Sequence, residues 1–119
     1  MLKNITLFLI LTSFLMVSES CKKTKEAIDC FEESLKVTMV HTKDNADSKK
    51  VTFTLAYAGS FDLQNVKWEF GDGQEETVTG MSVTHTYADA GSYEVRYTVS
   101  IKNDDESCSP AYQETITID

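Results

Sequence analysis

Three cysteines, Cys21, Cys30 and Cys108, are the side chains of this sequence best suited to covalent chemistry. A cysteine thiol can pair in a disulfide, which persists outside the reducing cytosol, or it can carry a lipid. Three thiols cannot all pair within one chain, so one of them needs a separate explanation. That explanation depends on whether the chain is exported.

The first twenty residues predict export. Lys3 stands in a short positive start, a mostly apolar run extends from Ile5 to Val17, and the small-residue stretch Ser18-Glu19-Ser20 follows. The apolar run is shorter than the roughly 20 residues that a membrane-spanning helix needs. We therefore expect residues 1–20 to be a signal peptide that is removed on export.

Cys21 is then the first mature residue, as is the lipid-bearing cysteine of bacterial lipoproteins. Ser20 fits such a cleavage site, whereas Ser18 replaces the usual leucine-like residue and Glu19 is atypical. Ordinary signal-peptidase cleavage is the alternative, because Ser18 and Ser20 also suit that enzyme. We favour a lipid anchor on Cys21, with residues 21–34 as a polar stem. The predicted location is the bacterial envelope, either in the periplasm or at the cell surface.

Few other groups could hold a ligand. The only histidines, His41 and His85, have no cysteine or carboxylate at zinc-like spacing, so we expect no metal site. The run Asp104-Asp105-Glu106 and the pair Glu75-Glu76 could offer oxygen atoms to Ca²⁺, which takes about six to eight. Solvated loop charge is the interpretation that we favour for both.

Two loops are candidates for partner contacts. One holds Phe61 and Asp62, and the other holds the acidic residues Asp104, Asp105 and Glu106. Phe61 either is an exposed aromatic contact for a glycan or a protein, or packs over the end of the core. We favour packing for Phe61.

The composition argues against nucleic-acid binding and catalysis. The chain keeps a formal net charge of −8 and has one arginine, Arg96, whereas nucleic-acid binding needs clustered Lys and Arg. We find no helix-borne carboxylate pair, nucleophile elbow, histidine-containing triad or phosphate loop. We therefore expect no enzyme activity, no cofactor and no nucleic-acid partner.

From Leu35 onward, apolar and polar residues alternate with a period of two, in short runs separated by Gly, Asp, Asn and Ser. Strands of this kind bury one face, and two sheets packed face to face satisfy that requirement. The pattern predicts seven strands: Leu35–His41, Val51–Tyr57, Asn65–Phe70, Glu76–Thr79, Ser82–Tyr87, Tyr93–Lys102 and Tyr112–Ile118.

Three motifs follow one another along these strands: Trp68-Glu69-Phe70-Gly71-Asp72-Gly73, His85-Thr86-Tyr87 and Gly91-Ser92-Tyr93-Glu94-Val95. In order and spacing they closely resemble the PKD (polycystic kidney disease) family of immunoglobulin-like modules. The resemblance implies an all-β, immunoglobulin-like sandwich of about seven strands over residues 35–119.

The same resemblance implies structural roles for the motif residues. Gly71-Asp72-Gly73 suits a tight turn, Trp68 suits the central core position, and His85 is expected to hydrogen-bond to a neighbouring strand or turn. Tyr93 resembles the tyrosine corner of immunoglobulin domains. Val95 occupies the position that antibody domains give to cysteine, so the usual disulfide between the sheets is missing.

A disulfide between Cys30 and Cys108 is the expected substitute. In the implied topology Cys30 precedes the first strand at the end of the sandwich where the loop before the last strand lies, and Cys108 is in or beside that loop. Two free thiols are the alternative interpretation.

PKD-like domains usually serve as interaction or spacing units. The resemblance therefore implies a non-catalytic module that contacts an envelope protein or a glycan, with the lipid anchor as its link to the membrane. A structural envelope protein that assembles with itself through the edge of the strand Tyr112–Ile118 is the alternative.

Overall fold

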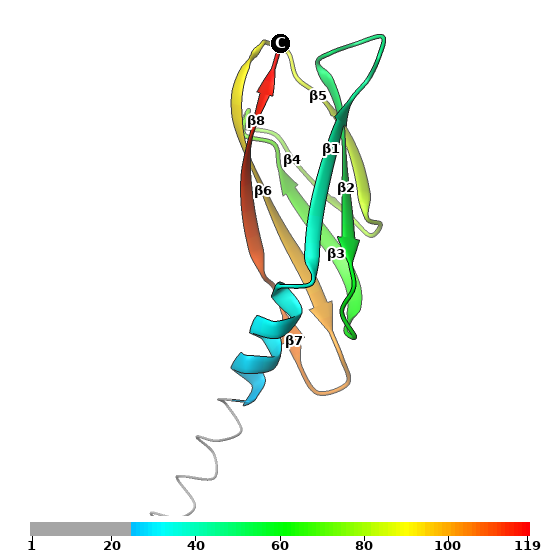
Figure 1. Cartoon of the computed structure of the whole chain (residues 1–119), viewed down its shortest axis with the longest axis vertical. Coiled ribbons are helices and arrows are strands. Elements are labelled where there is room, and N and C mark those ends of the chain that lie inside the picture. The colour runs from blue at the N-terminus through cyan, green and yellow to red at the C-terminus, as the bar shows by residue number, and fades with distance from the viewer. Residues whose placement is uncertain (1–24) are drawn as a thin grey trace, which may run out of the picture. The chain divides into compact units, whose positions relative to one another are not determined.

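The alternating runs form eight strands in a computed structural model, which describes residues 25–119 (Figure 1). All seven predicted strands are present, with ends that differ by a few residues, and a short eighth strand was missed. The strands are β1 (Val37–Lys43), β2 (Lys50–Tyr57), β3 (Asp62–Glu69), β4 (Glu75–Val78), β5 (Ser82–Thr86), β6 (Gly91–Lys102), β7 (Ser107–Cys108) and β8 (Ala111–Ile118).

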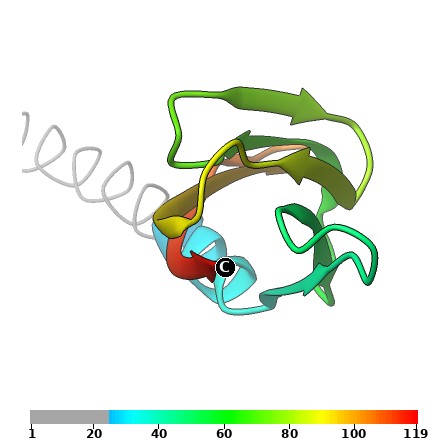
Figure 2. The same ribbon diagram turned by 90° about the horizontal axis from the view of Figure 1, so that it is seen from above.

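The strands form two antiparallel sheets. One has three strands in the order β1-β2-β5; the other has β4-β3-β6, with both β7 and β8 paired to β6. Figure 2 shows the sheets as two facing layers. The predicted all-β sandwich is thus confirmed.

The core lies between the inner faces of the sheets. Trp68 on β3 has no exposed surface, and its ring lies 5.6 Å from Phe53 on β2 and 5.3 Å from Tyr97 on β6. Every second residue of β2 and β6 also points into this space, as the period of two predicts. Truncating a buried tryptophan costs about 3–5 kcal/mol, so Trp68 is a major part of the stability.

The segment ahead of the sandwich, which the sequence predicted only as a polar stem, has regular structure in its described part. Residues 25–34 are helical. This run holds good helix formers, Lys, Glu and Ala, and its apolar residues Ile28 and Phe31 are three positions apart, a helical spacing. The chain divides between Glu32 and Glu33 into two units, of which the second is the sandwich.

The membrane-related predictions rest on the N-terminal region. The signal peptide over residues 1–20 and the lipidated Cys21 lie outside the described residues. Among residues 25–119, no helix has the length and apolar character that crossing a membrane requires.

Candidate functional site

The turn between β3 and β4 holds the first cluster of polar side chains. Gly71 and Gly73 have φ angles of 87° and 91°, values that glycine adopts without strain. Between them, Asp72 accepts a hydrogen bond of 3.0 Å from the Gln74 amide through Oδ1, and its Oδ2 lies 2.7 Å from His85 Nε2. The turn of one sheet is thereby joined to β5 of the other.

Two aromatic rings, of Phe70 and Tyr87, pack against His85. The residue is 8% exposed, and its ring stacks on Phe70 at 3.9 Å between centroids and meets the edge of Tyr87 at 4.7 Å. Burial raises the pKa of Asp72, but the hydrogen bonds from His85 and the Gln74 amide outweigh it and leave that pKa below its ordinary value. The pair lies within hydrogen-bonding reach but faces inward, so its role is to connect the sheets.

Two tyrosines of the motifs donate hydrogen bonds to backbone carbonyls. Tyr87 donates a hydrogen bond of 2.8 Å to the carbonyl of Phe70, and burial raises its pKa above the ordinary range. Tyr93 donates one of 2.7 Å to the carbonyl of Asp89, four residues upstream. This second contact has the geometry of a tyrosine corner, which the sequence led us to expect at Tyr93.

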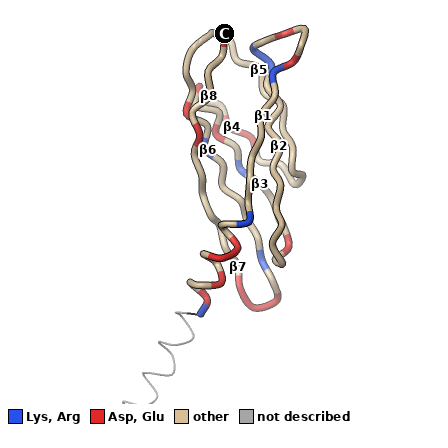
Figure 3. Tube along the Cα trace, viewed as in Figure 1, with Lys and Arg blue, Asp and Glu red and all other residues tan. Residues whose placement is uncertain are grey.

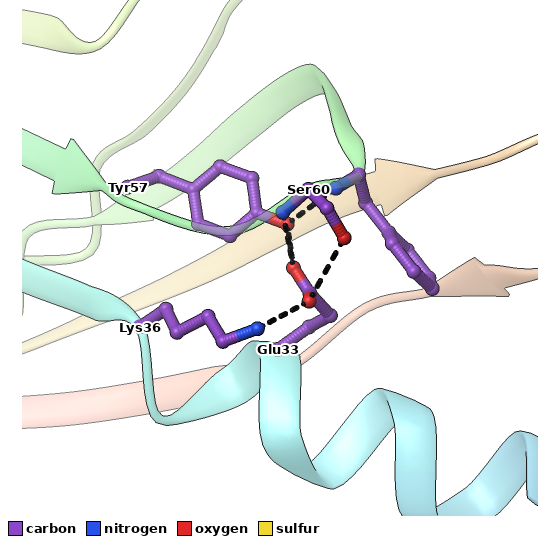
Figure 4. Close-up of polar contacts among 5 residues, drawn as sticks. Glu33, Lys36, Tyr57 and Ser60 are labelled. Carbon is purple, nitrogen blue, oxygen red and sulfur yellow. Dashed lines mark hydrogen bonds and ion pairs between the residues drawn. The ribbon is translucent and has the colours of Figure 1, made fainter.

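A second polar cluster surrounds Glu33, a carboxylate that sequence reasoning missed (Figure 4). Glu33 is 4% exposed and accepts hydrogen bonds of 2.7 Å from Lys36 Nζ, of 3.0 Å and 3.3 Å from the amide and hydroxyl of Ser60, and one from the Tyr57 hydroxyl. No local pattern marks this site, because two of its partners, Tyr57 at the end of β2 and Ser60 in the β2–β3 loop, follow more than twenty residues later.

The pKa values of Glu33 and Tyr57 both lie far from their ordinary ranges. Burial raises the pKa of Glu33, but the hydrogen bonds that it accepts prevail and lower the pKa to about 2. Burial, followed by the hydrogen bond to Glu33, raises the pKa of Tyr57 to about 12. Perturbed pKa values often mark catalytic groups. Here both oxygens of Glu33 are enclosed by donors of the same chain, so the carboxylate fixes the β2–β3 loop instead.

Local hydrogen bonds between side chains and backbone amides hold the candidate binding loops. Asn103 Oδ1 accepts hydrogen bonds of 2.9 Å and 2.7 Å from the amides of Asp105 and Glu106, which closes the loop that also contains Asp104. Among residues 25–119, no three acidic, histidine or cysteine side chains are grouped as a metal ion would require. Phe61 is half-buried, its amide donates to the Tyr57 hydroxyl at 3.1 Å, and Asp62 is exposed at the start of β3.

The cysteine pairing expected from the sequence is confirmed. Cys30 and Cys108 are both disulfide-bonded, so the interpretation as two free thiols is wrong. The strand β7, which pairs with β6 at Ile101 and Lys102, carries Cys108 and holds it 6% exposed. A disulfide with one half buried on a hydrogen-bonded strand is placed as a structural crosslink between the segment ahead of β1 and the five-stranded sheet.

A shallow groove of about 310 Å³ lies over the outer face of the five-stranded sheet, beside the β3–β4 turn. Its lining includes Glu69, Glu75, Glu94 and Arg96. Arg96 Nη2 lies 3.0 Å from Glu94 Oε1, so the one arginine of the chain is already paired with a carboxylate. The groove is therefore poorly suited to an anionic ligand.

Comparison with known proteins identifies this arrangement. The profile of the PKD domain matches residues 36–118, which is the whole sandwich from just before β1 to the end of β8. The chain belongs to the PKD domain family. No curated protein matched its sequence.

Two solved PKD domains share the fold. The PKD1 domain of the Vibrio cholerae metalloprotease PrtV is 28% identical, with a TM-score of 0.56 over 70% of this chain and 94% of that domain. The PKD1 domain of Vibrio anguillarum Epp is 22% identical, with a TM-score of 0.52 over 70% of this chain and 93% of that domain. The second match supports the fold alone.

The PKD assignment agrees with the inward-facing polar clusters. A PKD domain is a non-catalytic module that also occurs within enzymes, and it is typically extracellular or exported. In this PKD domain the polar motif residues connect turns and strands through hydrogen bonds. The surface that remains for a partner is made of strand faces and loops.

Proposed function

We propose that this protein is an exported, lipid-anchored interaction module of a bacterial envelope, which contacts a protein or a glycan and catalyses no reaction. The observation that carries the proposal is the PKD match over residues 36–118, because such domains are typically extracellular interaction or structural modules in bacterial proteases. The inward-facing Asp72–His85 and Glu33–Tyr57 pairs support the non-catalytic part.

The anchor is tested separately from the interaction. Lipidation of Cys21 predicts a mass for the membrane-extracted N-terminal peptide that exceeds the unmodified peptide by the mass of the attached lipid. A Cys21→Ser variant should leave the membrane fraction while its circular-dichroism spectrum stays that of the wild type. Recovery of an unmodified Cys21 thiol from the native protein would reject the lipid anchor and leave the interaction role intact.

The interaction is tested by capture from the native envelope, with the membrane-tethered protein as bait. We expect a glycan or protein to be retained by the folded domain, and not by the same bait after reduction and denaturation. A bait that retains the same material in both states would contradict a specific interaction module.

One observation favours a second candidate, self-assembly. Strand β8 pairs with β6 alone in the described sheets, so its other edge is open to strand addition. Self-assembly predicts a sedimentation coefficient that rises with protein concentration. A strict monomer at high concentration would reject this candidate.

A further inference from the structure

Exposed apolar side chains gather close to the proposed lipid anchor at Cys21. Among residues 25–119, five large apolar side chains are exposed, and three of them, Ile28, Phe31 and Leu35, lie within residues 28–35. Ile28 is 50% exposed and Phe31 is 63% exposed. Exposed apolar residues are ordinary when they stand alone, whereas a group of them marks a contact site for a membrane or another macromolecule.

The helix over residues 25–34 separates its apolar side chains from its charges. At about 100° per residue, Ala27, Ile28 and Phe31 fall within an arc of about 100° on one side of the helix, and all three are exposed. We call these three residues the apolar stripe. Figure 3 shows acidic and uncharged residues alternating along this helix, with a basic residue at its start. The other half of the helix surface holds the charged residues Lys25, Glu26, Asp29, Glu32 and Glu33.

We propose that the apolar stripe lies in the surface layer of the membrane that carries the lipid anchor. This inference rests on the proposed function, because it takes a lipidated Cys21 as the first mature residue. A helix with a charged face and an apolar face that includes Phe is the form that lies flat in a membrane surface. Cys30 of the same helix is disulfide-bonded to Cys108 on β7. A helix fixed in the membrane surface therefore also restricts how far the sandwich can turn about its anchor.

The short connection to Cys21 keeps the stripe close to the membrane. Lys25 follows Cys21 by four positions, which span at most about 14 Å when fully extended. The helix then rises about 1.5 Å per residue, so Ile28 lies no more than about 19 Å from the anchored cysteine. At that distance the anchor gives the stripe a high effective concentration at the membrane, and a contact that is weak alone becomes occupied.

The residues between the anchor and the stripe suit phospholipid head groups. Lys22, Lys23 and Lys25 follow Cys21 closely, and the first acidic residue of the mature chain is Glu26. Basic residues beside a membrane are attracted to anionic lipids. The charges ahead of the stripe and the apolar side chains within it therefore indicate the same occupant, a phospholipid surface.

A second copy of the chain fits the stripe less well. A stable protein interface buries roughly 800 Å² on each partner, far more than three side chains offer. Glu32 flanks the stripe on the helix surface, so pairing two stripes would also bring the Glu32 carboxylates of both copies near each other. Like charges across an interface repel, which disfavours such a pair.

Quenching by lipid tests the contact. The mature protein is coupled through the Cys21 thiol to a maleimide-bearing phospholipid in vesicles of phosphatidylethanolamine and phosphatidylglycerol, with Cys30 and Cys108 kept in their disulfide. Phe31→Trp places an indole on the stripe, and lipids with brominated acyl chains quench an indole that they touch. We expect the Phe31→Trp emission to shift to the blue on coupling and to lose intensity in brominated vesicles. Trp68 gives a constant background in every variant, because it has no exposed surface.

Val40→Trp is the matched control, because Val40 is also 63% exposed but lies on β1 of the sandwich. Its emission should be the same in brominated and unbrominated vesicles. Ile28→Glu, added to Phe31→Trp, places a charge on the stripe and should remove most of the quenching. Each of these changes replaces an exposed side chain, so the melting temperature should stay within a few degrees of the wild type.

Quenching at position 31 that is no stronger than at position 40 would overturn the contact, and so would quenching that Ile28→Glu leaves unchanged. A blue shift that grows with the density of protein on the vesicle, without loss of intensity to bromine, would assign the stripe to a second copy and also overturns it. The lipid anchor of the proposed function fails differently, through recovery of an unmodified Cys21 from the native protein. Because the maleimide lipid supplies the anchor in the quenching experiment, the two failures are distinguishable.

Discussion

His85 Nε2 on β5 lies 2.7 Å from Asp72 Oδ2 in the β3–β4 turn, and this contact joins the two sheets. The two side chains are 9% and 17% exposed. A contact between polar groups shielded in this way is stronger than a surface ion pair, because water competes less for both partners.

Asp72→Asn tests that contact. The amide oxygen can still accept from the Gln74 amide, but the carboxylate that faces His85 is gone, so we expect a loss of about 1–2 kcal/mol in the free energy of unfolding. Urea unfolding at pH 7 followed by Trp68 fluorescence measures the loss. Asp104→Asn is the control, because Asp104 is exposed in the β6–β7 loop and its change should stay within about 0.5 kcal/mol. Equal stability of the two variants would show that the contact contributes nothing.

Glu33 predicts a decline of stability in acid. Its pKa is about 2 in the folded chain, compared with a usual value of about 4.3 when unfolded. A lowered folded pKa contributes stability above the unfolded pKa, and that contribution is lost as the pH falls toward the folded pKa. Between about pH 5 and pH 2 the loss should be on the order of 3 kcal/mol.

Glu33→Gln removes this titration. The variant should be less stable than the wild type at pH 7 by about 2–3 kcal/mol, and the difference should shrink toward pH 2. Denaturant unfolding at a series of pH values measures both quantities. Glu32→Gln changes the exposed neighbour and should follow the wild-type curve. A difference between Glu33→Gln and wild type that stays constant with pH would contradict the assigned pKa.

The sandwich could be predicted from the sequence because the alternation of apolar and polar residues is visible within each of its longer strands. Val51, Phe53 and Leu55 alternate with threonines, and all three are buried. The Glu33 cluster gave no such signal, since a buried carboxylate is recognised only through partners that the fold supplies. Strand β7 was missed for a related reason. Its two residues are too few to show a period of two, and they are recognised as a strand only because they pair with β6.

Because Cys30 and Cys108 form a disulfide, we expect the stability of the domain to depend strongly on the redox state. The bond closes a loop of about 79 residues, which contributes roughly 4–5 kcal/mol through the lower entropy of the unfolded chain. Cys30→Ser combined with Cys108→Ser should lower the melting temperature by more than about 15 °C. The comparison is made in a Cys21→Ser background, in which reductant should then have no further effect. A melting temperature that the double replacement leaves unchanged would contradict the role of the bond.

Gly71 and Gly73 both have a positive φ, but only Gly71 lies close to other backbone atoms. Alanine at each position therefore separates the cost of backbone strain from the cost of a steric conflict. A Cβ at Gly71 would lie 2.6 Å from the Glu94 carbonyl oxygen and 2.9 Å from its nitrogen, both backbone atoms that cannot move aside freely. A Cβ at Gly73 would meet nothing within 4 Å. Gly73→Ala should therefore cost only the strain of a left-handed conformation, about 1–2 kcal/mol. Gly71→Ala adds a steric conflict between the turn and β6, so its loss in unfolding free energy should exceed that of Gly73→Ala by about 1–3 kcal/mol. Equal losses in the two variants, measured by urea unfolding, would mean that the turn can move away from β6 at little cost.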